Sequence, residues 1–360
     1  MVSKHPDRES ALLEPSTGIA TPKTKALTTS GLTGKGLAFQ LAVCSSILFV
    51  CIAIASVFGS TPVHLRDILN RNSTGHEVFF VLRLPRAFMA ALAGGSLALA
   101  GVLFQALLRD SLATPYTLGV SSGASLGAVV AICLGWNTLA GFSAVPAFSL
   151  VGAGLVLLAI SRVASRGGMS SQSLLLAGIT MNSICGAVII FLQSITSFTQ
   201  SLGITRWLMG ELDAPEYGIL AELAVILIPA CLIAWWFGRA WNLLAIGDDW
   251  ANARGVPARK FLIVGFLIGS VVTAAVTAYT GPIGFVGLIV PHALRLKFGA
   301  DHRVLIPCSF LLGGAFLVLS DLVSRVLLAP TEIPVGVITA LVGGPVFIWM
   351  LYSRETHRGS

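Results

Sequence analysis

The sequence predicts an all-helical protein that crosses a membrane about ten times. Of its 360 residues, 55% are hydrophobic and only 11% are charged, whereas charged residues make up about 25% of a typical soluble chain. The lysines and arginines also gather between long apolar stretches, as expected because a charge at the bilayer centre costs roughly 2.5–3.5 kcal/mol. These two observations exclude a soluble fold.

Ten apolar stretches are candidate spans, since about 20 apolar residues are needed to cross roughly 30 Å of hydrocarbon. In chain order they are 38–59, 87–108, 118–135, 144–161, 174–195, 218–238, 261–280, 282–294, 304–321 and 334–352. The eighth is too short to cross alone and contains Pro282, Gly284, Gly287 and Pro291. We therefore expect neighbouring helices to shelter a broken backbone there.

The polar ends of the chain flank this membrane domain. Residues 1–37 mix Ser, Thr, Pro, Gly and charges, a composition that lacks the apolar surface for a core and predicts a disordered cytoplasmic tail. The membrane domain then covers 38–353, and residues 354–360 form a second cytoplasmic tail. The first apolar run is longer than the core of a cleaved signal peptide, so we expect it to remain as a span.

The basic residues predict the orientation of the chain. If the N-terminus is cytoplasmic and the chain alternates through ten spans, 17 of the 23 lysines and arginines lie on the inner side. The other six are Arg66, Arg71, Arg83, Arg86, Arg206 and Arg325. This bias favours a cytoplasmic-membrane protein with both termini inside, and it explains the net charge of +7 without a nucleic-acid partner.

No pattern for catalysis, metal binding or cofactor binding is present. The six cysteines are scattered through apolar stretches without a C-x-x-C, and the histidines do not cluster. We interpret His292 as a hydrogen-bonded structural residue. A catalytic cluster such as His-Glu-x-x-His and a phosphate-binding loop are both missing. We therefore expect a transport protein without enzymatic activity, cofactor or metal site, whose energy comes from another chain.

Small residues are spaced for close helix packing. Gly119, Gly123 and Gly127 recur every fourth residue and share one helix face. Tight packing in lipid is the ordinary interpretation, and lining of a transport path is the alternative.

Three segments suggest more specific roles. Arg83 and Arg86 lie on the predicted outer side, where they either extend toward lipid phosphates or bind an acidic partner. Arg325 either pairs with Asp321 four residues earlier or also faces a partner.

The stretch 248–254 predicts a short surface helix. The broken run 281–295 is typical of helices that line transport paths.

Taken together, these segments resemble the FecCD-type permeases, the membrane subunits of ATP-driven importers for ferric siderophores, haem and cobalamin. The resemblance covers roughly residues 60–353. It rests on an ordered series of motifs, namely Arg83-Leu-Pro-Arg86, Gln105–Pro115, Leu118–Gly127, Gly281–Arg295, Asp301-His-Arg, Asp321-x3-Arg325, Glu332–Ala340 and Gly344-Pro-Val-Phe.

The resemblance implies a fold and a set of partners. It implies ten spans per subunit in the type II importer architecture, and a second permease subunit, either an identical copy or a sibling, around a central path. Two cytoplasmic ATPases and an extracytoplasmic substrate-binding protein complete the expected assembly in the membrane lipid.

The same resemblance assigns roles to individual residues. Glutamates of the binding protein would pair with Arg83, Arg86 and Arg325. The helix that couples to the ATPase would contain Gly247, Ala251, Arg254 and Gly255, since Gly-x3-Ala-x3-Gly matches the family pattern. The translocation path and its inner gate would include Asp110, Leu112, Pro115, Ser122, Gly123 and Pro291.

The chain departs from the family pattern at two places. Asp110-Ser-Leu-Ala-Thr-Pro115 stands where the family usually has Asn-Pro-Leu-Ala-Asp-Pro, and Arg254 stands where Leu is common. A ferric siderophore is the expected substrate, with cobalamin and haem as alternatives. An ion-coupled secondary transporter is the rival class, but it requires mid-span ionisable residues, and only Glu222 and Asp321 lie within spans, each near one end.

Overall fold

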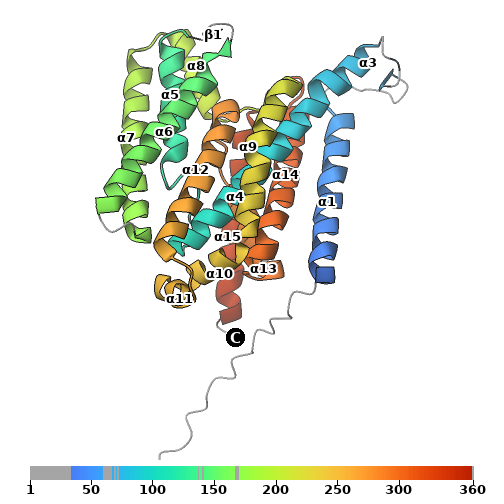
Figure 1. The fold of residues 1–360 in the computed structure, drawn as a ribbon. Helices are drawn as coiled ribbons and strands as arrows, with labels where there is room; N and C mark the ends of the chain where they lie inside the picture. The colour runs from blue at the N-terminus through green and yellow to red at the C-terminus, as the bar shows by residue number, and fades with distance from the viewer. Residues whose placement is uncertain are drawn as a thin grey trace, which may run out of the picture.

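The computed structural model describes residues 34–59, 67–68, 70, 73–136, 138–139, 142–166 and 170–358. It confirms the all-helical fold class (Figure 1). The long helices are α1 (Gly34–Val57), α4 (Leu84–Leu108), α5 (Val120–Cys133), α6 (Ala144–Arg166), α7 (Ser171–Ile195), α9 (Tyr217–Trp236), α12 (Ala258–Thr280), α13 (Val286–Phe298), α14 (His302–Val326) and α15 (Val335–Arg358). The short elements are α3 (Thr74–Glu77), the π-helix η1 (Val78–Arg83), β1 (Thr138–Leu139), β2 (Phe142–Ser143), α8 (Phe198–Leu208), α10 (Gly238–Ile246) and α11 (Asp248–Ala253).

Each predicted span overlaps one of the ten long helices. Within the described residues, seven helical segments are long and apolar enough to cross a membrane. One of these segments joins α3, η1 and α4 into a single run of 35 residues. The helices α5 and α13 and the apolar part of α15 are shorter. The bundle therefore contains both helices long enough to cross a membrane and shorter helices, which need neighbouring helices to shelter their ends.

The boundaries differ from the predictions at both ends of the chain. α1 begins at Gly34, inside the predicted tail, and α15 continues to Arg358, so residues 354–358 are helical. Polar residues extend both helices because an established helix adds turns without another apolar contact. The rest of the predicted tails, residues 1–33 and 359–360, lies outside the described residues, as do Arg66 and Arg71.

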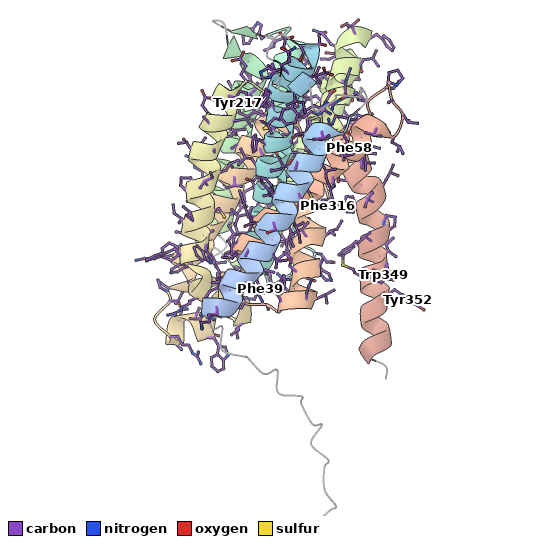
Figure 2. The ribbon with its side chains drawn as sticks, turned by 90° about the vertical axis from the view of Figure 1, so that its right-hand side faces the viewer. Phe39, Phe58, Tyr217, Phe316, Trp349 and Tyr352 are labelled. Atoms are coloured by element: carbon purple, nitrogen blue, oxygen red, sulfur yellow. The ribbon has the colours of Figure 1, made fainter. Side chains whose placement is uncertain are left out.

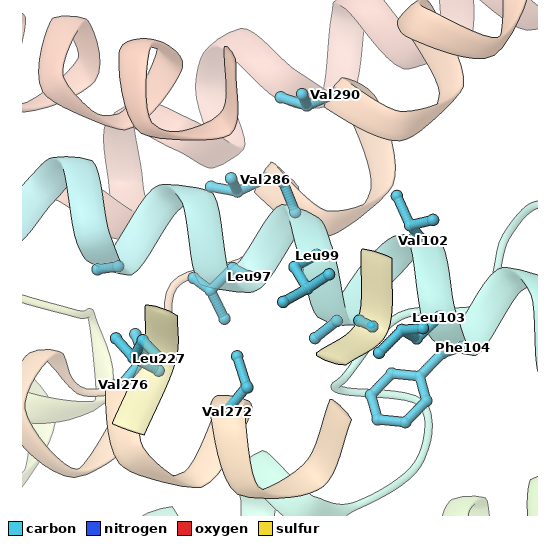
Figure 3. Packing of buried hydrophobic residues seen from close by; sticks show 14 of the residues in the cluster. Leu97, Leu99, Val102, Leu103, Phe104, Leu227, Val272, Val276, Val286 and Val290 are labelled. Atoms are coloured by element: carbon cyan, nitrogen blue, oxygen red, sulfur yellow. The ribbon is translucent and has the colours of Figure 1, made fainter. Parts of the chain in front are cut away.

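α4 is the central helix of the bundle. Twenty of its 25 residues are buried, and it packs against α14, α12, α13, α9 and α1. Figure 3 shows Leu97 of α4 between Val272 of α12 and Val286 of α13, with Leu103 beside Phe104 farther along α4. Its apolar side chains therefore contact neighbours on every side, and α4 positions whatever lies at its two ends.

Glycines allow the closest helix contacts. A Cβ on Gly101 of α4 would lie 1.9 Å from the carbonyl oxygen of Gly287 of α13, and one on Gly94 would lie 2.3 Å from that of Gly313 of α14. Any larger side chain would push the helices apart. Gly123 and Gly127 of α5 meet α6 in the same way, as the tight-packing interpretation expects. Gly119 differs from the prediction of one shared helix face, because it precedes α5 with a φ of +72° and faces Gly178 of α7.

Exposed apolar side chains cover the outside of the bundle. Figure 2 shows Phe39 and Phe58 near opposite ends of α1, and Trp349 and Tyr352 on α15. All four are more than 60% exposed. Such a surface is stable in hydrocarbon or against another subunit.

The two ends of the bundle carry different elements (Figure 1). One end, here called the arginine end, contains η1, α8 and the last turns of α14. The opposite end, the α11 end, contains α10 and α11.

Candidate functional site

η1 and α14 bring the three predicted docking arginines together at the arginine end. Arg83 is the last residue of η1, and its Nη1 donates to the carbonyl oxygen of Val57, 2.6 Å away at the end of α1. Arg86 follows Pro85 in the first turn of α4, and Arg325 lies in the last turn of α14. All three therefore lie at the arginine end, where η1, α4 and α14 meet.

Two carboxylates from the same chain hold Arg86 and Arg325. Arg86 Nε donates to Asp321 Oδ1 at 2.9 Å, and Arg86 Nη1 donates to Glu332 Oε2 at 2.8 Å. Arg325 Nε lies 3.0 Å from Asp321 Oδ2, which is the i,i+4 pair that the sequence indicated. The contacts of Arg86 with Asp321 and Glu332 could not be predicted from the sequence, because the partners lie 235 and 246 positions away.

This cluster is largely buried but opens into a pocket. Asp321 is completely buried, Arg83 and Arg325 are 5% exposed, and the Glu332 side chain is 40% exposed. The pocket has a volume of about 440 Å³ and is lined by Val78, Leu82, Arg83, Arg86, Ala214, Arg325 and Glu332. Three arginines against two carboxylates leave one positive charge, so the pocket can accept an acidic group from a partner.

α11 forms the second candidate surface, at the opposite end. Gly247 joins it to α10 in an extended conformation, and Gly255 ends it with a φ of +80°, which favours glycine. Ala251 is fully buried and Arg254 is exposed, with its guanidinium 5.8 Å from the Trp250 ring. The small Ala251 therefore allows α11 to pack against its own chain. The outward surface is formed by its larger neighbours.

The predicted gate segment links α4 to α5 by side-chain-stabilised turns. Asp110 Oδ1 accepts from the backbone N–H of Leu112 at 2.9 Å. Thr114 Oγ1 and Thr117 Oγ1 accept from each other's backbone N–H, at 3.3 and 3.1 Å. Asp and Thr can both cap such turns, so the departures from the family pattern at Asp110 and Thr114 preserve the means of forming them. Leu112 is 48% exposed, whereas Pro115 is buried.

The stretch of broken backbone expected in the eighth apolar stretch (282–294) is shorter than predicted. The irregular backbone is confined to residues 281–285, and Gly287 and Pro291 both lie within α13. Pro291 has no N–H for the carbonyl of Gly287, and Gln105 of α4 donates its Nε2 to that oxygen at 3.3 Å. α4 thus compensates for the proline, as expected for a sheltered helix.

The remaining predicted path residues lie in three places. Ser122 of α5 donates to Asn182 Oδ1 on the exposed face of α7. Gly123 faces Val156 and Gly152 of α6 inside the chain, so it serves helix packing here, and Pro291 is buried in α13. Of the three, only Ser122 contacts an exposed polar surface.

The structure contains a further polar network at the α11 end, which the sequence did not predict. Asp301 caps α14 by accepting from the backbone N–H of Arg303, and it also accepts from Asn242 of α10 at 2.9 Å. Burial raises the pKa of Asp301, but the hydrogen bonds from Arg303 and Asn242 outweigh it and lower this pKa to about 2. The Asp301-His-Arg motif was recognised in the sequence, but the 59-residue separation from Asn242 hid this contact.

The fold and the two surfaces define a polytopic membrane permease, and comparison with known proteins specifies its family. Residues 47–353 match the model of the FecCD transport family, and the chain belongs to this family. The hemin transport system permease protein HmuU of Yersinia pestis is 36% identical over 323 residues, covering 87% of this chain and 95% of that protein. The cobalamin import system permease protein BtuC of Halobacterium salinarum is 40% identical over 285 residues, covering 78% and 75%.

A solved structure gives the same result for the fold. An inward-facing structure of a metal-chelate type ABC transporter superposes with a TM-score of 0.77 at 30% identity, covering 88% of this chain and 99% of that one. The chain is therefore an ABC transporter permease of the FecCD family, a transport component that works with ATPase subunits.

Proposed function

We propose that this chain is the membrane subunit of an importer that moves a metal chelate into the cytoplasm. A substrate-binding protein delivers the chelate at the arginine end, which faces outward. Two ATPases attach to α11 on the cytoplasmic side, where both termini also lie. The observation that carries this proposal is the placement of the two predicted partner surfaces at opposite ends of a membrane-spanning bundle (Figure 1).

The charge balance at the arginine end supports the docking role. The cluster retains one positive charge beside a pocket, and Glu332 is exposed enough to move. A glutamate from the binding protein can bind Arg83 and Arg86 there without any requirement for Arg86 to leave Asp321. The internal pairs then hold the guanidinium groups in position before the partner arrives, which reduces the ordering cost of docking.

The exposed face of α7 supports a path between two permease subunits. Thr180, Asn182 and Ser183 are exposed on this helix although it is apolar enough to span the membrane. Thr180 and Ser183 donate to carbonyl oxygens of α7 itself, so the exposed Asn182 amide is the group that lipid disfavours. Its surroundings suit a second subunit and the chelate path. Ser122, bonded to Asn182, belongs to the same surface.

The names of the relatives favour a macrocyclic chelate. The two relatives described above are named for hemin and cobalamin transport. We therefore place haem or cobalamin ahead of a ferric siderophore as the substrate. The decisive experiment is to identify the binding protein that docks on this chain and to measure its affinity for hemin, cyanocobalamin and a ferric hydroxamate.

Docking is tested by Arg83→Glu combined with Arg86→Glu in the assembled complex. We expect at least a tenfold loss of binding-protein affinity and a matching loss of uptake, because the pocket becomes negative. Arg206→Glu is the matched control, since Arg206 lies at the same end, outside the pocket, and is 67% exposed in its side chain.

The double variant also takes Arg86 away from Asp321 and leaves it with Arg325, so folding must be checked by melting temperature and assembly with the ATPase. Arg83→Gln, which leaves Arg86 bound to Asp321, should retain the fold and weaken docking about threefold. Unchanged binding-protein affinity and uptake in both variants would refute the docking role.

A further inference from the structure

The last turn of α4 has an unusual ending. Arg109 follows the helix in the left-handed region, with φ 54° and ψ 29°. Among the described residues, only Arg109 and Phe285 are non-glycine residues with positive φ. Glycine is the usual residue where a helix ends this way, because it has no Cβ to clash. An arginine at this position therefore points to a role for its side chain.

The Arg109 side chain binds both sides of the corner between α10 and α11. Its Nε donates to the carbonyl oxygen of Leu244 in α10 at 3.0 Å. Its Nη2 donates to the carboxylate of Asp248, the first residue of α11. Since Gly247 connects the two helices, one guanidinium bridges the corner at which α11 leaves α10.

The same turn of α4 is joined to two other elements. Ser171, at the start of α7, donates its Oγ to the carbonyl oxygen of Leu107 at 2.6 Å. Directly after Arg109, Asp110 begins the turn that leads to the buried Pro115. The end of α4 is therefore a junction where α11, α7 and the segment 110–117 meet.

The link between α4 and α11 is suited to movement. The Arg109 and Asp248 side chains are 33% and 40% exposed, so water and ions screen their attraction. In contrast, Ala251 packs α11 into the chain by apolar contact. The guanidinium fork offers several donors, which allows α11 to tilt while it stays bound to α4.

We propose that Arg109 is the positioning residue that transmits movement of α11 to the end of α4, and through that turn to α7 and the 110–117 segment. The proposal rests on the proposed function, because it takes α11 as the surface on which the ATPase acts. It adds a specific connection from that surface to the helices that border the path. The side chain provides the connection, and the left-handed backbone aims it.

The test separates the side chain from the backbone. Arg109→Gly favours the left-handed conformation and removes the side chain, so the variant is expected to fold. The complete complex, with its ATPases and binding protein, is reconstituted in proteoliposomes. Uptake is measured with hemin, cyanocobalamin and a ferric hydroxamate as probes, and ATP hydrolysis is measured in the same vesicles. Arg162→Ala, which removes an exposed arginine of α6, is the matched control.

We expect Arg109→Gly to retain the ATPase subunits and to hydrolyse ATP within twofold of wild type, while uptake per ATP hydrolysed falls at least tenfold. Exchange of the charges, with Arg109→Asp and Asp248→Arg together, should restore at least one-third of the wild-type ratio. Such a rescue assigns the effect to the attraction between residues 109 and 248, and the fall in uptake per ATP at nearly unchanged hydrolysis separates transmission from a purely structural role.

Two results would overturn the proposal. The first is uptake per ATP within twofold of wild type in Arg109→Gly. The second is a parallel fall of hydrolysis and uptake, which would mean that Arg109 only seats the ATPase. If the wild-type complex fails to take up any of the three probes with ATP, the proposed function fails instead.

Discussion

The two ends of this permease use the same chemistry in different surroundings. At the arginine end, Asp321 is fully buried between Arg86 and Arg325. At the α11 end, Arg109 and Asp248 pair where both side chains are about one-third exposed. A buried pair has no water to replace a lost partner, whereas an exposed pair exchanges partners with water at little cost. The comparison teaches that buried pairs hold the arginine end in one arrangement, whereas the α11 end remains adjustable.

The largest effect is expected from Asp321→Asn. The substitution leaves Arg86 and Arg325 buried without their shared carboxylate, and an uncompensated buried charge costs about 3–5 kcal/mol of stability. Thermal unfolding of the purified chain in detergent measures this loss. A change below about 1 kcal/mol would contradict a preformed arginine end.

An intermediate effect is expected from Asp301→Ala at the α11 end. The change removes the cap of α14 and the bond from Asn242, and loss of a helix cap typically costs about 1 kcal/mol. Guanidinium or thermal unfolding should show this decrease at neutral pH. No loss relative to wild type would mean that the capping contacts contribute nothing.

The pH dependence of the same residue sharpens this prediction. The folded pKa of Asp301 is about 2, below its ordinary value of 3.8, so its stabilising contribution is present above 3.8 and is lost as the pH falls toward 2. Wild type and Asp301→Asn should therefore approach each other in stability between pH 4 and about pH 2. A difference that grows as the pH falls would contradict the direction of the shift.

The smallest effect is expected from Glu211→Gln. Glu211 receives hydrogen bonds from Arg206 at 2.7 and 3.0 Å, but the Arg206 side chain is 67% exposed. Exposed pairs contribute about 0–1 kcal/mol and weaken with salt. We expect a loss below about 0.5 kcal/mol that disappears in high salt. A loss comparable to that of Asp321→Asn would show that burial does not distinguish the two pairs.

Local signals predicted the helices, whereas contacts distant in sequence could not be predicted. Apolar length predicted every long helix, and the glycine spacing at Gly123 and Gly127 predicted a close helix contact, whose partner the structure identifies as α6. The hydrogen bond of Gln105 to Gly287 joins residues 182 positions apart, and no pattern in a single sequence connects them. The same holds for Arg86 with Glu332 and Arg109 with Asp248. The motifs were visible, but their partners required the fold.

The central claim is that the two ends face opposite sides of the membrane and bind different partners. Thr331→Cys at the arginine end and Ala253→Cys in α11 place one exposed thiol at each end, with the unsubstituted chain as the background control. The measurement is labelling by a membrane-impermeant maleimide in oriented vesicles, with and without each partner. We predict that Cys at 331 reacts only from outside and is protected by the binding protein, and that Cys at 253 reacts only from the cytoplasmic side and is protected by the ATPase. Labelling of both positions from one side, or protection by the other partner, would contradict the claim.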